Sequence, residues 1–146
     1  MPEVTKKIIA AATWQPIGVV LDGSAVTLTI KTGVDENRKN ETWSYNKNRA
    51  EATCDADGNK SFTTHEKERY AYARADGFEG QLIGRIQSLN FSPNLQPFAV
   101  GTSAVIEVPA GYSGELQFVI NDEIYPNPAG EGVADNEGEI TVTVSW

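Results

Sequence analysis

An all-β fold, an antiparallel β-sandwich or jelly roll, is what this sequence predicts, and three observations support it. Apolar and polar residues alternate with a period of two in most regular segments, as expected for strands that bury one face. Turn signals separate these segments, among them Asp22-Gly23, Asp57-Gly58 and Ala110-Gly111. No segment shows a sustained apolar stripe of helical period. About seven or eight strands joined by turns indicate a two-sheet architecture.

Seven segments are expected to form strands. In chain order they lie within residues 6–14, 18–21, 24–33, 81–89, 103–110, 114–122 and 138–146. The alternation is clearest in three of them, residues 24–33, 114–122 and 138–146. The apolar residues that share a face there are Val26, Leu28 and Ile30, then Leu116, Phe118 and Ile120, and finally Ile140, Val142, Val144 and Trp146.

Two long polar stretches, residues 34–66 and 121–137, are predicted to be loops on this rigid scaffold, where sites are usually found. Residues 64–75 contain helix formers without a periodic stripe and are expected to form a short helix or an ordered loop. Trp43 and Tyr45 lie in the first stretch, where aromatic side chains pack in a core or line a sugar site. For Trp43 we expect core packing.

Composition restricts the function. The chain has 146 residues, which fits a single domain over residues 1–146, and its net charge of −8 disfavours nucleic acid and anionic membrane surfaces as partners. The N-terminal segment is too weakly apolar for a secretory signal, and no segment has transmembrane length, so we expect no membrane insertion. Synthesis in the cytoplasm is expected, with non-conventional export left open. Cys54 is the sole cysteine and is expected to be a free thiol without function.

Residues 120–146 carry the pattern that most needs explaining. The clusters Asn121-Asp122-Glu123 and Asp135-Asn136-Glu137 bracket a loop rich in Pro and Gly, with a strand before it and another after it. Neighbouring strands would bring Asp122, Asp135 and Asn136 together as hard oxygen ligands of the kind calcium prefers. Local chemistry alone favours ordinary turn residues over such a site.

Three other candidate sites are weaker. Asp55, Asp57, Asn59, Ser61 and Glu66 have the spacing of an EF-hand loop, but Lys60 stands where that loop needs glycine, so a polar turn is favoured. A catalytic pair of Cys54 and His65 lacks the surrounding signature of a cysteine hydrolase. A glycosidase needs two carboxylates at a defined separation, which a sequence with 20 Asp and Glu cannot reveal.

Several segments in one order resemble the PA-I-type galactophilic lectin family, which comprises small calcium-dependent bacterial lectins with a galactose-binding-like β-sandwich. They are "ATWQPIGVVLDGSAVTLTIKTG" at 12–33, "TWSY" at 42–45, "DADG" at 55–58, "GQLIGRIQ" at 80–87, "FAVG" at 98–101, "SGELQFVIND" at 113–122 and "DNEGEITVTV" at 135–144. The similarity spans about residues 10–146. The most specific pieces are "GQLIGRI" and the two oxygen-rich clusters.

The resemblance implies a calcium site and a sugar site that share residues. Tyr45 would give calcium a main-chain carbonyl, and Asp122, Asp135 and Asn136 would give side-chain oxygens, with one more carbonyl from the loop between the clusters. Two vicinal hydroxyls of galactose would then bind the calcium, with sugar contacts from Tyr45, Asp122, Asn136 and His65. The resemblance also implies a homo-oligomer, with a tetramer as the expected form. Trp146 would either contribute to its interface or close the core.

Departures from the family concern the sugar more than the calcium. The family's His-Pro pair has no counterpart, because Glu66 follows His65, and Asp stands at 135 where the family has Asn. The 123–134 loop is longer and contains Pro126 and Pro128. We therefore expect a non-enzymatic, calcium-dependent lectin whose galactose recognition is weak or displaced to another terminal sugar. The alternatives are an interaction or toxin-associated protein on the same scaffold and, last, a small glycoside hydrolase.

Overall fold

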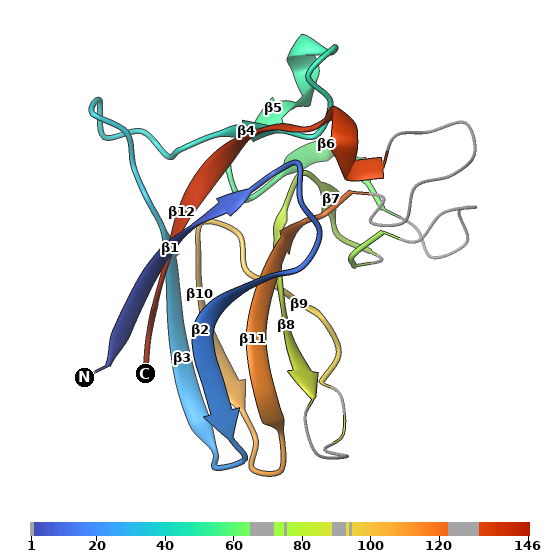
Figure 1. Ribbon diagram of the computed structural model, residues 1–146. Coiled ribbons are helices and arrows are strands. Elements are labelled where there is room, and N and C mark those ends of the chain that lie inside the picture. Colours follow the sequence, from blue (N-terminus) through green and yellow to red (C-terminus); the bar gives the residue numbers. More distant parts are fainter. Residues whose placement is uncertain (1, 65–71, 75, 89–92, 94, 123–131) are drawn as a thin grey trace.

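The computed structural model describes residues 2–64, 72–74, 76–88, 93, 95–122 and 132–146 (Figure 1). Within them the regular elements, in chain order, are β1 (Glu3–Ile9), β2 (Gln15–Asp22), β3 (Val26–Thr32), β4 (Trp43–Ser44), η1 (Ala50–Ala52), β5 (Thr53–Cys54), β6 (Asn59–Thr63), β7 (Phe78–Glu79), β8 (Leu82–Ser88), β9 (Phe98–Ala99), β10 (Ser103–Val108), β11 (Ser113–Ile120), η2 (Gly132–Asp135) and β12 (Glu137–Ser145). The η elements are single short 3₁₀ turns. No helix in the described part of the chain is long and apolar enough to cross a membrane.

Two antiparallel sheets form the body of the molecule. The larger sheet has the order β10-β3-β12-β4-β5, with β1 also paired to β12, and the smaller sheet has the order β2-β11-β8-β9. A separate pair, β6 and β7, lies beyond them. The prediction of an all-β, antiparallel sandwich is confirmed. The finer assignment to a jelly roll stays a prediction.

The alternating segments become the long strands because one face of each is buried. In β3, Leu28 and Ile30 are fully buried whereas Thr27 and Lys31 are exposed. In β11 and β12 the alternate apolar residues Leu116, Phe118, Ile120, Ile140, Val142 and Val144 are likewise fully buried. Trp146 is half-buried against this core, which agrees with either of its expected roles, closing the core or contributing to an interface. The core therefore lies between the two sheets.

One irregularity interrupts the pairing of β2 with β11. Glu115 pairs with Val20 and Gln117 pairs with Pro16, so three residues of β2 stand opposite one residue of β11. Gly18, in the middle of these three, has a φ of 85°, a conformation that side chains disfavour. The glycine therefore permits a bulge that bends this edge strand.

Residues 34–66 are more ordered than predicted, and the expectation of one long loop is wrong for the described residues 34–64. β4 pairs with the start of β12, and β5 pairs with β4, so this stretch extends the larger sheet. Trp43 is 2% exposed and its packing in the core is confirmed. The indole Nε1 of Trp43 donates a hydrogen bond to the Gly80 carbonyl at 2.7 Å. Of the predicted helix or loop at 64–75, residues 65–71 and 75 lie outside the described residues.

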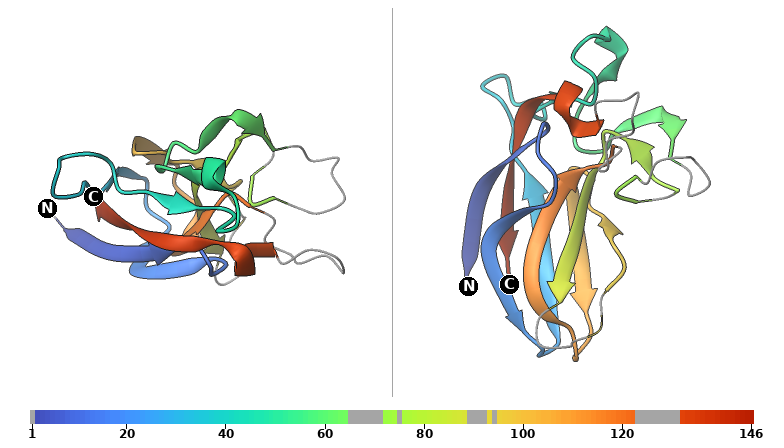
Figure 2. Two further views of the ribbon diagram at one scale, coloured as in Figure 1. Left: turned by 90° about the horizontal axis from the view of Figure 1, so that it is seen from above. Right: turned by 45° about the vertical axis from the view of Figure 1, so that its right-hand side comes forward.

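We call one end of the sandwich the polar end. It comprises the described residues of 34–64, 72–81, 121–122 and 132–138, and it lies at the top of Figure 1. The right-hand view of Figure 2 shows η2 and the β6–β7 pair at the same end as β4 and β5. The two chain ends lie at lower levels, away from it. All four predicted metal ligands belong to the polar end.

Candidate metal centre

Tyr45 and Asn136 are brought together by the pairing of β4 with β12. Glu137 pairs with Ser44 and Gly138 pairs with Trp43, so one further step along this antiparallel ladder sets Asn136 opposite Tyr45. The N–H of Lys47 donates a hydrogen bond to the Asp135 carbonyl at 2.7 Å. Residues 45–47 therefore lie beside residues 135–136, as the sequence predicts for two parts of one site.

Asn136 has an unusual hydrogen-bond balance. The residue is 4% exposed, and its Nδ2 donates to the Ala10 carbonyl at 2.9 Å. The amide oxygen Oδ1 is buried and accepts no hydrogen bond within the described part of the structure. A buried oxygen left in this state is destabilising by about 1–3 kcal/mol. A bound cation would remove that penalty, because amide oxygens are calcium ligands.

Two carboxylates and one main-chain carbonyl complete the described part of the set. Asp122 follows β11 and Asp135 ends η2, and each has one buried side-chain oxygen, Oδ2 and Oδ1 respectively. Tyr45 is 4% exposed, and its main-chain carbonyl accepts no hydrogen bond from the described residues. All of these are hard oxygen donors, which suit calcium better than zinc.

The end of the smaller sheet is joined to the larger sheet through Gly80. The Gly80 N–H donates to the Asn121 carbonyl at 2.9 Å, and the Gly80 carbonyl accepts the bond from Trp43. Asn121 directly precedes Asp122, and Trp43 belongs to the strand that leads to Tyr45. This bridge places the Asp122 side of the predicted site next to its Tyr45 side.

Comparison with known proteins assigns neither a family nor a function to the chain. No protein-family model matches the chain, and no curated protein matches it significantly in sequence. The resemblance to galactophilic lectins therefore stays a prediction, and the case for a metal site rests on the local structure. Among the described residues no group of three or more His, Cys, Asp and Glu is gathered for a metal. The predicted ligand set contains only two carboxylates and would not form such a group.

Two predicted features lie where the structure gives no description. His65, the expected sugar contact and the partner of Cys54 in the catalytic alternative, is outside the described residues. So are residues 123–131, which include Pro126, Pro128 and most of the loop expected to supply a further carbonyl ligand. The described structure thus brings together the sides that carry Tyr45, Asp122, Asp135 and Asn136, and it leaves the other contacts as predictions.

The EF-hand alternative is wrong, and the favoured polar turn is confirmed. The flanking elements are the strands β5 and β6, not helices. Asp55 Oδ1 accepts the N–H of Asp57 at 2.9 Å, and Asp57 Oδ1 accepts the N–H of Thr102 at 2.8 Å. Gly58 has a φ of 80°, which closes the turn. These carboxylates stabilise loops and are not aimed at one point.

Cys54 is unsuited to act as a nucleophile. Burial, with a smaller contribution from the nearby Asp55 charge, raises the pKa of the Cys54 thiol to about 12. The thiol is therefore protonated at neutral pH, whereas a reactive cysteine needs a lowered pKa. Its Sγ lies 3.8 Å from the Gly80 carbonyl. The expectation of a free thiol is confirmed, and its lack of function stays a prediction.

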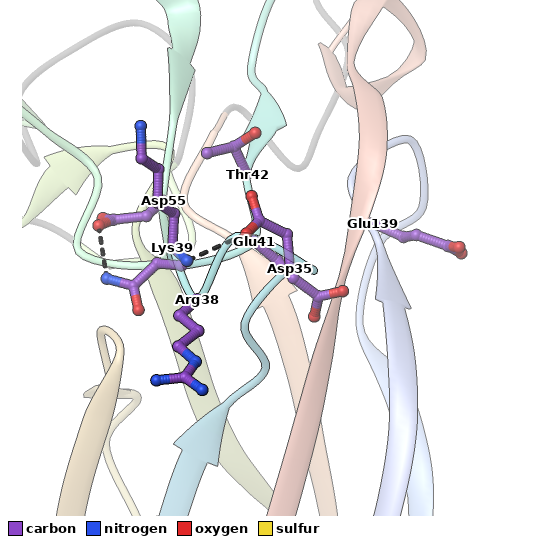
Figure 3. Close-up of a pocket in the computed structure, with 8 residues that line it drawn as sticks. Asp35, Arg38, Lys39, Glu41, Thr42, Asp55 and Glu139 are labelled. Carbon is purple, nitrogen blue, oxygen red and sulfur yellow. Dashed lines mark hydrogen bonds between the residues drawn. The ribbon is translucent and has the colours of Figure 1, made fainter.

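A polar cavity, which the sequence did not predict, lies beside residues 35–42. It has a volume of about 700 Å³ and contains none of the predicted metal ligands (Figure 3). Its carboxylates take part in local hydrogen bonds: Glu41 Oε1 accepts the Thr141 N–H at 2.8 Å, and Asp55 Oδ2 accepts Asn40 Nδ2 at 3.1 Å. The lining residues are Asp35, Arg38, Lys39, Asn40, Glu41, Thr42, Asp55 and Glu139. Their mixed charges and mutual contacts stabilise the loop.

Proposed function

We propose that this protein is a calcium-dependent sugar-binding protein that performs no chemical step of its own. The observation that carries the proposal is the buried, unbonded amide oxygen of Asn136 beside Tyr45 and Asp135. Three kinds of hard oxygen donor at one end of the sandwich fit calcium in charge and in chemistry. The net charge of −8 also favours a cation and a neutral ligand over an anionic one.

The step from calcium to sugar follows from the number of ligands. Calcium takes about six to eight oxygens, and Tyr45, Asp122, Asp135 and Asn136 supply fewer. When bound, the ion would supply open coordination positions to a pair of neighbouring hydroxyl groups. Asp122 would accept a hydrogen bond from one of the same hydroxyls through a carboxylate oxygen, and the amide of Asn136 would form a further hydrogen bond to them. A galactose-type sugar is the proposed ligand, on the basis of the family resemblance.

Assembly is the third part of the proposal. A single site for a monosaccharide binds weakly, and several linked sites raise the apparent affinity without new contacts. We therefore expect a homo-oligomer, and a tetramer first. Light scattering at tens of micromolar protein measures this directly, and a mass equal to one chain would contradict the expected assembly without bearing on calcium.

The test is a glycan array probed with calcium and again with EDTA. Binding to terminal galactosides that EDTA abolishes is the expected result, and Asp122→Ala should lose it. Glu139→Gln is the control, because it removes a charge from a carboxylate that pairs with Lys7 at the surface. Calcium-dependent binding to a different terminal sugar would correct the specificity alone. If calcium binds and no sugar does, the scaffold serves another partner, and EDTA-resistant sugar binding would contradict the role of the metal.

A further inference from the structure

Asn121 is fully buried and uses its whole side chain to hold a distant segment. Its Oδ1 accepts the N–H of Arg74 at 2.9 Å. Its Nδ2 has three acceptors within reach: the carbonyls of Phe78 at 3.1 Å and of Arg74 at 3.2 Å, and Thr64 Oγ1 at 3.3 Å. A buried amide in this position is stable only with such partners, so the side chain and the segment fix each other.

Thr64 completes this network from the end of β6. The residue is fully buried, and its hydroxyl donates to the Arg74 carbonyl at 2.6 Å. The same hydroxyl accepts the N–H of Gly77 at 3.1 Å, and the Thr64 N–H donates to the Gly77 carbonyl at 3.0 Å. We call Asn121 and Thr64, with the hydrogen bonds between them and to Arg74, Gly77 and Phe78, the amide clamp.

The main chain of Asn121 extends the clamp to Gly80, which packs against Tyr45. The Asn121 N–H donates to the Gln81 carbonyl at 2.7 Å, and its carbonyl accepts the Gly80 N–H at 2.9 Å. Gly80 packs so closely on Tyr45 that a Cβ atom there would lie 2.9 Å from Tyr45 Cδ1, and it would also collide with Cys54 Sγ. Asn121, which directly precedes Asp122, therefore holds the turn at Gly80 against Tyr45 together with the bond from Trp43.

We propose that the amide clamp positions the metal centre: it holds Asp122 and Tyr45 at the separation that calcium needs and links the Arg74 segment to calcium binding. This rests on the proposed function. Asn121 and Thr64 are positioning residues and do not bind the ion. Groups that orient metal ligands typically change metal affinity by about 10- to 100-fold when they are removed. Apparent metal affinity falls when only a small fraction of the molecules has the conformation that binds the ion. Ligands that are already positioned before binding avoid this loss.

The experiment compares Thr64→Val with Thr64→Ser. Valine has the shape of threonine without the hydroxyl, whereas serine retains the hydroxyl. Terbium luminescence, excited through Trp43 and Tyr45 and competed with calcium, measures metal affinity in each folded variant. We expect Thr64→Val to weaken calcium binding by about tenfold or more and Thr64→Ser to stay near the wild type. Val108→Ala, in a core residue 2% exposed at the far end of β10, is the control for stability loss alone.

A second variant and a second measurement keep the test decisive if Thr64→Val does not fold. In Gly77→Ala a new Cβ would lie 2.8 Å from Asn121 Nδ2, which disturbs the clamp without deleting any hydrogen-bonding group. Hydrogen exchange at the Arg74 amide, followed with and without calcium, reports on the clamp directly. In the wild type calcium should slow this exchange at least several-fold, and in the clamp variants the difference should shrink.

The failures are distinguishable. If the wild type binds no calcium, the proposed function and the clamp's role both fall. If the wild type binds calcium while the folded Thr64→Val or Gly77→Ala variant binds equally well, the positioning role alone is wrong. A loss of affinity in Val108→Ala equal to that in Thr64→Val would also overturn it, because stability alone would then explain the effect.

Discussion

The body of the sandwich and its polar end are stabilised in different ways. In the body, the buried positions of β3 and β12 are apolar and fall on every second residue, whereas β8 and β11 also bury consecutive residues, at 82–84 and 118–120. At the polar end, the structure buries Ser44, Thr64, Asn121 and Asn136, and these are all of the buried polar residues among those described. Burial of polar groups is costly unless they are bonded, so a cluster of them is expected where function requires it.

Because of this contrast, we expect substitutions in one region to leave the property that depends on the other region unchanged. The free energy gained by apolar burial in the body is roughly proportional to the buried area, so it changes little when side chains shift slightly. The hydrogen bonds at the polar end depend on direction and distance. A substitution in the body should therefore change stability without changing the proposed metal site. A substitution at the polar end should change metal affinity at the proposed site by more than its effect on stability suggests.

The largest expected effect is in the body. Leu28 is fully buried in β3, so Leu28→Ala should lower the free energy of unfolding by about 2–5 kcal/mol through lost burial and the cavity left behind. Urea denaturation measures this loss. Calcium affinity of the folded variant should equal that of the wild type. A parallel fall in affinity would show that the two regions are coupled and would break the comparison.

Calcium should give the next largest effect, at the polar end only. A ligand that binds the native state at 100 times its Kd stabilises it by about 2.7 kcal/mol. We expect a higher Tm in millimolar calcium than in EDTA, with the increment lost in Asp122→Ala and kept in Glu139→Gln. Identical melting curves of the wild type in both conditions would show that calcium does not stabilise the native protein.

Trp43 tests the boundary between the regions, since its ring is in the core and its Nε1 reaches Gly80 at the polar end. Trp43→Phe keeps most of the apolar ring and leaves the Gly80 carbonyl without this donor. The expected loss is about 1–3 kcal/mol of unfolding free energy, together with weaker calcium binding. Unchanged calcium affinity in this variant would show that Trp43 stabilises the body of the sandwich only and does not support the proposed metal site.

The smallest effect concerns Cys54 and pH. Its pKa rises from 9.0 to about 12 on burial, so the folded protein holds the thiol proton more tightly than the unfolded chain does. The linked stability is fully present below pH 9 and is lost as pH rises toward 12. Cys54→Ala should remove this part of the alkaline decline. Labelling of the native thiol at pH 8 should be slow, and rapid labelling there would contradict the burial argument.

The sequence predicted the body well because a period of two runs through β2, β3, β12 and most of β11. It did not predict β4, β5, β7 or β9, since strands of two residues contain no period. For this reason the sequence did not predict that residues 34–64 contain short strands that extend the larger sheet. Their order comes from contacts with β12 and with Gly80 that no local pattern encodes.

For the site, the oxygen-rich clusters indicated Asp122, Asp135 and Asn136, and the family resemblance added Tyr45. The bond from Asn136 to Ala10, which joins residues 126 positions apart, depends on the assembled sheet. The same holds for Asn121 and Thr64. Asn121 stood in a cluster that the sequence singled out, yet its burial and the three residues that its side chain bonds, Arg74, Phe78 and Thr64, could be known only from the fold.

The pairing of β1 with β12 has a mechanical consequence. The strands run antiparallel from Glu3 opposite Ser145 to Ile9 opposite Glu139, and the Trp146 N–H donates to the Pro2 carbonyl at 3.2 Å. The two chain ends therefore lie side by side, remote from the polar end (Figure 1). Pulling these ends apart would load the ladder like a zipper, one pair of residues at a time, and would reach the polar end last. A molecule tethered by either end to a bead or a chip would still present the polar end outward.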